Sequence, residues 1–500
     1  MNKLTATDAS FIYAETKDCP MSIASLQYMQ LPDNTPVEEF VSTLKHFITQ
    51  RTHLVPYLTS RLEHASGNLD HPNWVKDADF DINNHIYTVA VPAPGGFKQV
   101  EQTVARLHEH ALPRHQPLWD IAVLTGLANG QVAYYNRVHH ACLDGVAAQA
   151  SYNILMDQKP GGEVPTQGLP SGDRRSMTRA DQLTGLLTEM TKQSINSITR
   201  APGRLNAVAR LLQRSLDPSK DLGSTMAACP TTVLNRHIDE RRIFAAGELP
   251  LSGVKHLAKH LNCTINDVFL SLCGGALRTY LNRHGALPDK TLIAGCPVSL
   301  RAANDASANN QVSMMRTALG TDIEDPVERV GYVAHQARLA KEMLAETSPL
   351  MPADVHLPFF GLAARGLQTA AALTKWAEHT PPPVNVVISN VPGPRVPLYS
   401  NGARMLSHYP VSIPAHGAGL NITVQSYVDQ LFIGVTAATR VAPDADRLRD
   451  DIQDAYAALH NAVSAEIVPL ETNKMAEDIL FKAAADLALP PGNGFAEQVA

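Results

Sequence analysis

The sequence has few of the residues that build disulfide frameworks or structural metal sites. Only six cysteines occur in 500 residues, and no two of them form a CxxC pair. A set this sparse argues against a disulfide scaffold and a structural zinc site, and it fits a reducing compartment. The six are Cys19, Cys142, Cys229, Cys263, Cys273 and Cys296.

Long apolar runs and an excess of positive charge are also missing. No stretch of about 20 apolar residues occurs, so we expect no membrane-spanning helix, and residues 1–10 lack the apolar core of a signal peptide. Lys plus Arg number 42 and Asp plus Glu number 48, a net charge of −6, so we expect no nucleic-acid partner. Hydrophobic residues make up 44%, which excludes a disordered chain.

The chain divides into two α/β regions joined by a long linker. Residues 1–157 and 231–465 both alternate between helical and strand patterns, and two large domains suit the length. Residues 158–230 begin with a run rich in proline and glycine, which is typical of a linker. We interpret residues 466–500 as a C-terminal appendage.

Periodicity and turn residues predict the main elements of both regions. Asn129-Gly130 between two β-rich runs is a hairpin signal. The predicted helices are 37–51, 100–111, 145–157, 251–261, 265–281 and 445–463. The predicted strands are 121–127, 131–138, 292–300, 384–389, 421–428 and 431–437.

Part of the linker carries a local excess of positive charge. Between Met190 and Lys220, six basic residues stand against one acid, Asp217, a net charge of +5. One interpretation is a solvated linker. The other is contact with an anionic membrane or lipid-droplet surface, because basic amphipathic helices bind such surfaces. The apolar stretch Leu357–Trp376 is either a second contact of this kind or part of the core.

The strongest chemical signal is the run Val138–Val146, in which two adjacent histidines end a predicted strand. Neighbouring side chains on a strand point to opposite faces, so His139 and His140 should have different roles. Asp144 lies where the chain has turned back and can brace the histidines. Gly145 permits positive φ or close approach of a ligand.

Four interpretations of this run stay open from spacing alone. It is a strand-to-helix corner with two satisfied histidines, a metal site, a site with one histidine as general base, or a site with Cys142 as nucleophile. Diverging side chains weaken the metal reading. Nothing in the sequence lowers the pKa of Cys142, which weakens the last one.

The run His139-His140-Ala141-Cys142-Leu143-Asp144-Gly145 matches the HHxxxDG motif of CoA-dependent acyltransferases. Five further blocks occur in the order of one family. With them, the sequence from 1 to about 463 resembles the bacterial wax ester synthase/diacylglycerol acyltransferases. The blocks are Thr7–Phe11 with Pro20-Met21, Pro117-Leu118-Trp119, Asn266-Asp267-Val268, Pro297–Arg301 and Ser389–Pro394.

This resemblance implies a fold of two α/β sandwiches of the chloramphenicol-acetyltransferase type, with an active-site tunnel between them. It also implies that His140 is the general base, His139 a structural support and Asp144 the residue that orients the motif. Members of the family pair this aspartate with a distant arginine, and Arg301 is the matching candidate. Its alternative is a surface cation at a strand end.

The other blocks admit a structural and a functional reading each. Asn266 and Asp267 either cap a helix from Val268 or assist the site, and the two are compatible. Trp119 is either a packing residue or a tunnel wall. Ser389 ends a predicted strand, and Asn390 begins a rigid turn whose backbone could line the tunnel.

The function implied by the resemblance is O-acyl transfer from acyl-CoA to a long-chain alcohol or diacylglycerol, with no bound cofactor or metal. The acceptor is insoluble in water, so we expect a cytoplasmic protein bound peripherally to the inner membrane face or to lipid droplets. The alternatives are a relative that acylates an amine or a small alcohol, and a non-catalytic lipid-binding paralogue.

Overall fold

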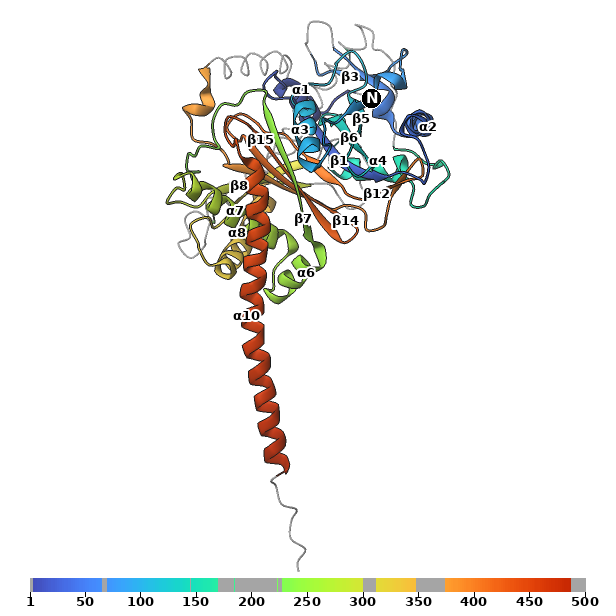
Figure 1. The fold of residues 1–500 in the computed structure, drawn as a ribbon. Coiled ribbons are helices and arrows are strands. Elements are labelled where there is room, and N and C mark those ends of the chain that lie inside the picture. The colour runs from blue at the N-terminus through green and yellow to red at the C-terminus, as the bar shows by residue number, and fades with distance from the viewer. Residues whose placement is uncertain are drawn as a thin grey trace, which may run out of the picture.

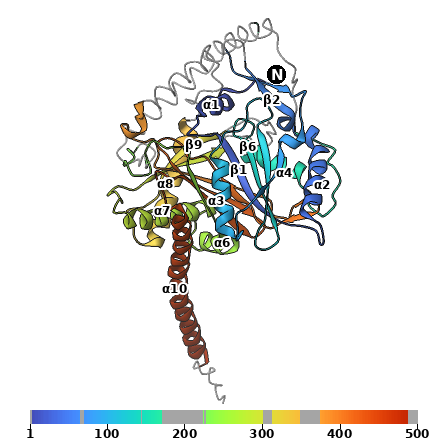
Figure 2. The same cartoon turned by 45° about the horizontal axis from the view of Figure 1, so that its top comes forward.

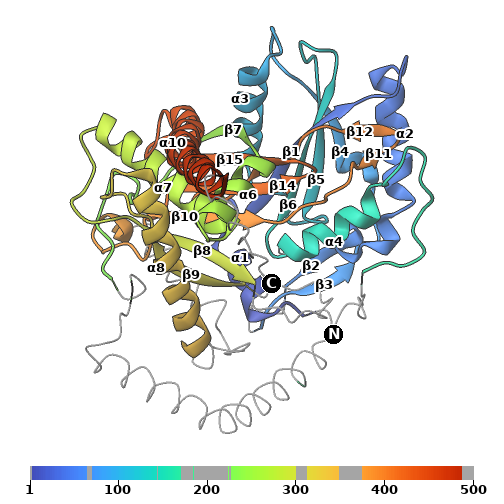
Figure 3. The ribbon, with the colours of Figure 1, turned by 90° about the horizontal axis from the view of Figure 1, so that it is seen from below.

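The computed structural model describes residues 3–64, 70–143, 145–169, 227–299, 312–347 and 374–486, and the single residues 184 and 223. Two α/β halves lie side by side in it, each built on one sheet with helices against it (Figures 1 and 3). This is the two-sandwich arrangement that the sequence predicts. The described residues do not define the expected tunnel, which stays a prediction.

The first sheet has seven strands, ordered β11-β12-β1-β6-β5-β4, with β13 also paired to β1. Its pairs are antiparallel except for β4 and β5. A separate two-stranded sheet, β2 (Ser60–Glu63) with β3 (Asn73–Lys76), lies close to the N-terminus. The seven strands are β1 (Ser22–Gln30), β4 (Ile86–Ala90), β5 (Trp119–Thr125), β6 (Val132–His139), β11 (Tyr399–Ser400), β12 (Ala403–Met405) and β13 (Tyr409–Val411).

Three of these strands come from the C-terminal half of the sequence. After β10 the chain leaves the second sheet, forms β11, β12 and β13 in the first, and returns as β14. Ala24 of β1 pairs with Val411 of β13. The two halves are therefore interlocked by the chain itself. The predicted boundaries at 157, 230 and 465 stay predictions.

The second sheet has six strands, ordered β7-β15-β14-β10-β8-β9. Strand β10 runs parallel to both of its neighbours, β8 and β14, and the remaining pairs are antiparallel. The six strands are β7 (Arg242–Pro250), β8 (Ile293–Ser299), β9 (Val312–Ala318), β10 (Val386–Val391), β14 (Leu420–Tyr427) and β15 (Gln430–Ala438).

Helices cover both sheets. Seen from below, α6, α7, α8 and α10 lie on the side of the second sheet, and α2 and α4 on the side of the first (Figure 3). The far part of α10 projects from the body of the molecule (Figure 1). The α-helices are α1 (Ala6–Ala14), α2 (Val37–Thr49), α3 (Phe97–His108), α4 (Gly145–Leu155), α6 (Leu251–His260), α7 (Ile265–Arg283), α8 (Pro326–Thr347) and α10 (Ala445–Asp486).

Helix α3 joins the two halves through buried polar contacts. Glu101 accepts a hydrogen bond of 2.7 Å from the amide of Ala246 on β7. Burial lowers the pKa of His108 to about 3, so its ring is neutral at pH 7. Its Nδ1 lies 2.8 Å from the Tyr135 hydroxyl, and its Nε2 lies 2.9 Å from the carbonyl oxygen of Ser412. A neutral imidazole can accept the first bond and donate the second.

The predicted elements correspond to observed ones, with shifted ends. Both hairpins form, β5–β6 and β14–β15, because β-rich runs and the short turns between them specify them locally. Helix α10 continues to Asp486, past the predicted end at 463. Residues 464–486 include five alanines and three glutamates, which favour helix.

Candidate active site

The histidine pair lies where β6 ends. The strand finishes at His139, which is paired with Ser22 of β1. The amide of His139 donates to the carbonyl of Leu118 at 3.0 Å, and the amide of His140 donates to the carbonyl of Met21 at 2.8 Å. The main chain of the two histidines is therefore fixed from two sides, His139 by Leu118 and His140 by Met21.

The next three residues of the motif are buried against helix α1. Ala141, Cys142 and Leu143 belong to a small apolar cluster with Ala9, Ile12 and Tyr13 of that helix. Figure 2 shows α1 close to the N-terminus, on the side of β6. Helix α1 begins at a Thr5 cap, whose hydroxyl oxygen accepts from the Asp8 amide at 3.1 Å. A firmly capped helix thus supports the motif.

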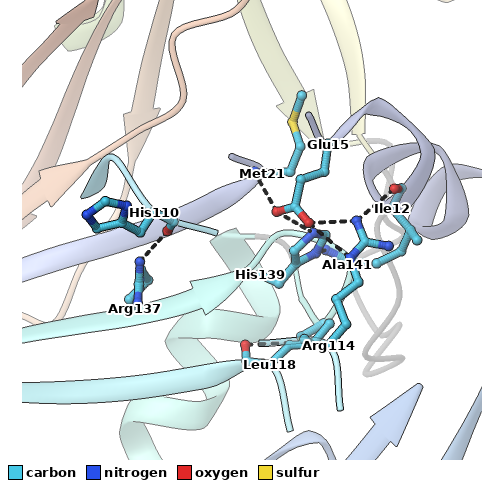
Figure 4. A network of polar contacts seen from close by, with 10 residues as sticks. Ile12, Glu15, Met21, His110, Arg114, Leu118, Arg137, His139 and Ala141 are labelled. Carbon is cyan, nitrogen blue, oxygen red and sulfur yellow. Dashed lines mark hydrogen bonds and ion pairs between the residues drawn. The ribbon is translucent and has the colours of Figure 1, made fainter. Parts of the chain in front are cut away.

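His139 is fully enclosed, and protein groups engage both of its ring nitrogens. Its exposed fraction is 1%. Nδ1 accepts a hydrogen bond of 3.0 Å from the Ala141 amide, so the ring proton of the neutral form lies on Nε2. Nε2 faces Glu15 Oε1 at 3.4 Å (Figure 4). This geometry favours the predicted structural role of His139.

Glu15 connects His139 to Arg114 and to the main chain of Met21. Its Oε2 accepts from Arg114 Nη2 at 2.6 Å and from Nε at 3.1 Å, and its Oε1 accepts from the Met21 amide at 3.2 Å (Figure 4). Burial alone would raise the pKa of Glu15, but its contacts with His139 and Arg114 outweigh burial and lower it from 4.5 to about 2. Glu15 is therefore a carboxylate at neutral pH.

His140 is only half-buried, and its ring lies flat against Phe11. The two ring centroids are 4.1 Å apart and the planes differ by 6°. A face-to-face stack occupies the face of the imidazole. The nitrogen lone pair and N–H that transfer protons lie in the ring plane, so this stack does not use them. His140 differs from His139 in its burial, since the His139 ring is fully enclosed.

Cys142 is not in an environment that activates a thiol. Its Sγ is buried and lies 4.0 Å from the carbonyl of Leu118. Burial, with a smaller contribution from Asp8, raises the pKa of the Cys142 thiol far above its usual range. Among the described residues, no group of three or more His, Cys, Asp or Glu side chains is placed to hold a metal ion.

The structure brings Asn266 and Asn390 together, although 124 residues separate them. Asn390 Nδ2 donates to Asn266 Oδ1 at 3.4 Å, at the start of α7 and the end of β10. The capping hypothesis was wrong in detail. Helix α7 begins at Ile265, its N-cap is Thr264, and Asp267 closes the capping box by accepting from the Thr264 amide at 3.0 Å.

Trp119 makes packing contacts. Its exposed fraction is 2%, its Nε1 donates to the carbonyl of Leu58 at 3.0 Å, and its ring stacks on His85 at 4.5 Å. These contacts favour the packing alternative over a tunnel wall. Ser389 is half-buried on β10, opposite Thr423 of β14.

Two candidates lie outside the described residues, Asp144 and Arg301, so their predicted pairing stays a prediction. Gly145 is the first residue of α4. Sequence reasoning missed Glu15, Arg114 and the position of the Phe11 ring. The available signal was an acid directly after the apolar helix of the N-terminal block.

Comparison with known proteins decides the family. The model of the wax ester synthase/diacylglycerol acyltransferase catalytic domain matches residues 4–269, and that of the C-terminal domain of the same family matches residues 308–460. The chain belongs to this family. It is an acyltransferase, as the motif and the five further blocks predict.

Relatives of the family match over nearly the whole chain. A putative diacylglycerol O-acyltransferase of Mycobacterium tuberculosis is 34% identical, over 92% of this chain and 100% of the relative. The solved structure of a wax ester synthase/diacylglycerol acyltransferase from Marinobacter aquaeolei is 29% identical, with a TM-score of 0.66, and covers 93% of this chain and 100% of that one.

The fold is shared more widely. The first condensation domain of the calcium-dependent antibiotic synthetase superposes with a TM-score of 0.55 at 14% identity, over 92% of this chain and 96% of that one. At this identity the likeness concerns fold alone. It confirms the two-sandwich fold of the chloramphenicol-acetyltransferase type.

Proposed function

We propose that this acyltransferase moves a long-chain acyl group from acyl-CoA to a fatty alcohol or diacylglycerol, with His140 as the general base. The observation that supports the proposal is the difference between the two histidines. His139 is fully enclosed, with its ring nitrogens facing the Ala141 amide and Glu15, whereas His140 is half-buried and its ring lies flat against Phe11. Family membership supports the choice of substrates.

The reaction needs one proton carrier and no covalent enzyme intermediate. His140 takes the hydroxyl proton while the alcohol oxygen forms a bond to the thioester carbonyl carbon. The tetrahedral intermediate collapses, the carbon–sulfur bond breaks, and the imidazolium returns the proton to the leaving thiolate. An imidazole suits both steps, because its usual pKa lies near neutral pH.

The remaining predicted residues have supporting roles in this proposal. Asp144 and Gly145 shape the turn after the histidines, and Arg301 pairs with Asp144. Asn266 is held by Asn390 at the start of α7, where a polar side chain can face a substrate. Ser389 lies on the same strand as Asn390 and is the candidate for the adjoining part of the substrate-tunnel wall.

The direct test is release of free CoA from palmitoyl-CoA in the presence of different acceptors. We expect release with long-chain alcohols, with diacylglycerol, or with both, and no release without an acceptor. Release with amines or short alcohols alone would support the alternative acceptor class. No release with any acceptor, together with tight palmitoyl-CoA binding, would support a lipid-binding paralogue.

We expect Cys142→Ala to keep near-normal turnover. The thiol is buried and protonated, and a histidine base requires both substrates to be bound together. The measurement is rapid mixing of enzyme with palmitoyl-CoA, with and without alcohol. A burst of free CoA without alcohol that disappears in Cys142→Ala would contradict the mechanism.

We also propose that the enzyme collects its insoluble acceptor at a membrane or lipid-droplet surface in the cytoplasm. Within the described ranges, no helix combines the length and apolar content that a bilayer crossing needs. The proposed contact is the basic segment Met190–Lys220, which lies outside the described residues. The second candidate, Leu357–Trp376, lies largely outside them too.

Reversing Arg204, Arg210 and Arg214 to glutamate changes the local charge from +5 to −1. We expect weaker binding to anionic vesicles by several kcal/mol at low salt, at about 1 kcal/mol per cation, and less at high salt. Activity on a short, soluble alcohol should persist. The measurement is co-sedimentation with vesicles of an anionic phospholipid.

The matched control reverses three exposed lysines elsewhere, with the same change in total charge. Lys255 and Lys259 lie on α6, and Lys290 lies in the loop before β8. This control should bind vesicles like the unchanged protein. Equal binding by both triple variants and the unchanged protein would show that the basic segment is only a linker.

A further inference from the structure

The plane of the His140 ring needs a support that its main chain does not provide. The hydrogen bond from the His140 amide to Met21 fixes the backbone. The torsion that turns the imidazole plane is broad for histidine, so the backbone alone leaves the ring free to rotate. A general base must present its nitrogen in one direction, because a displacement of about 1 Å can cost roughly 100-fold in rate.

Phe11 provides such a support. Its ring is parallel to that of His140 within 6° at 4.1 Å, so any rotation of the imidazole out of this plane drives its atoms into the phenyl ring. The stack also keeps solvent from this face of the base.

Phe11 is itself well held. It lies on α1, where its carbonyl accepts from the Glu15 amide at 3.2 Å. Its side chain packs both against the core of the second half and against the small apolar cluster beneath α1. The same short helix thus places Phe11 on His140 and, one turn later, Glu15 beside His139.

We infer that Phe11 is a positioning residue of the acyl-transfer reaction, whose ring sets the plane of His140 and shields one face of it. The inference rests on the proposed role of His140 as the base. In this role Phe11 acts through His140 and not on the reacting atoms. Removal of its ring should therefore lower turnover without weakening substrate binding.

We expect Phe11→Leu to lower kcat by about 10- to 100-fold, with KM for palmitoyl-CoA changed by no more than about 2-fold. Phe11→Tyr keeps the stacking ring and should recover most of the loss. The matched control is Phe80→Leu, which removes a phenylalanine–histidine stack of 5.3 Å on His85. That variant should keep its kcat.

The decisive measurement is the same substitution in a His140→Ala background. If Phe11 acts through His140, adding Phe11→Leu should lower the residual rate no further, because residues that act as a unit are non-additive. If Phe11→Leu lowered activity by damaging the fold, the same loss of activity would recur in the His140→Ala background. The melting temperature of each variant shows that the protein measured is folded.

Failure of the proposed base and failure of the Phe11 inference give different results. Normal turnover of His140→Ala would overturn the proposed base, whatever Phe11 does. A dead His140→Ala with a fully active Phe11→Leu would overturn this inference alone. Equal losses in Phe11→Leu and Phe11→Tyr, or a further loss in the His140→Ala background, would also overturn it.

Discussion

Replacing His140 with alanine is expected to lower kcat by about 10²–10⁴-fold while the protein stays folded. General-base assistance contributes that much to a rate, and no other described side chain takes its place beside the motif. The measurement is CoA release at saturating palmitoyl-CoA and alcohol. The fold should persist, because the His140 ring is half-buried and its main-chain bond to Met21 does not depend on the side chain.

The matched control for this substitution is His53→Ala. His53 is exposed, in the short 3₁₀ turn Thr52–Leu54. The His53→Ala variant should keep its turnover, so a loss of turnover in His140→Ala cannot be ascribed to removal of a histidine as such. Near-normal turnover of His140→Ala would contradict the assignment of the base.

The sequence was sufficient for the parts of the site that depend on local pattern. Alternation along a strand predicts that His139 and His140 differ, and in the structure His139 is enclosed whereas His140 is half-buried against Phe11. The order of the family blocks predicts the fold. Both inferences use neighbouring residues or short motifs, which a single sequence displays directly.

Contacts between residues far apart in the chain could not be predicted from the sequence. Arg114 lies 99 positions from Glu15, and nothing in either local pattern marks the pair. The strands of residues 399–411 are two or three residues long, too short for a period of two to show, so their place in the first sheet could not be predicted. The Thr264 cap was readable, because Thr264 stands three positions before Asp267.

The carboxylate of Glu15 has the largest expected effect on stability near the site. Its side chain is 5% exposed and its partner Arg114 is 30% exposed, so water screens their ion pair only in part. The contacts with His139 and Arg114 prevail over burial and lower the pKa of Glu15 from 4.5 to about 2. By linkage, a shift of this size corresponds to about 3 kcal/mol of folding free energy at neutral pH.

Glu15→Gln is therefore expected to lower the free energy of unfolding by about 3 kcal/mol at pH 7, because the amide keeps the shape but loses the charge. The folded-state pKa lies below the unfolded value. The contribution is thus complete well above pH 4.5 and is lost as the pH falls towards 2. The difference between the two proteins should shrink over that range, as measured by urea unfolding at pH 7, 5 and 3.5.

The matched control for Glu15→Gln is Glu378→Gln, at an ion pair of similar length on the surface. Glu378 and Arg440 are 3.2 Å apart, with side chains 27% and 42% exposed. Exposed pairs contribute about 0–1 kcal/mol, so this variant should differ little from the unchanged protein. If the stability of Glu15→Gln also equalled that of the unchanged protein at every pH, the charge of Glu15 would not stabilise the histidine pair. The His139 ring would then be held by its bond from the Ala141 amide and by the packing around it.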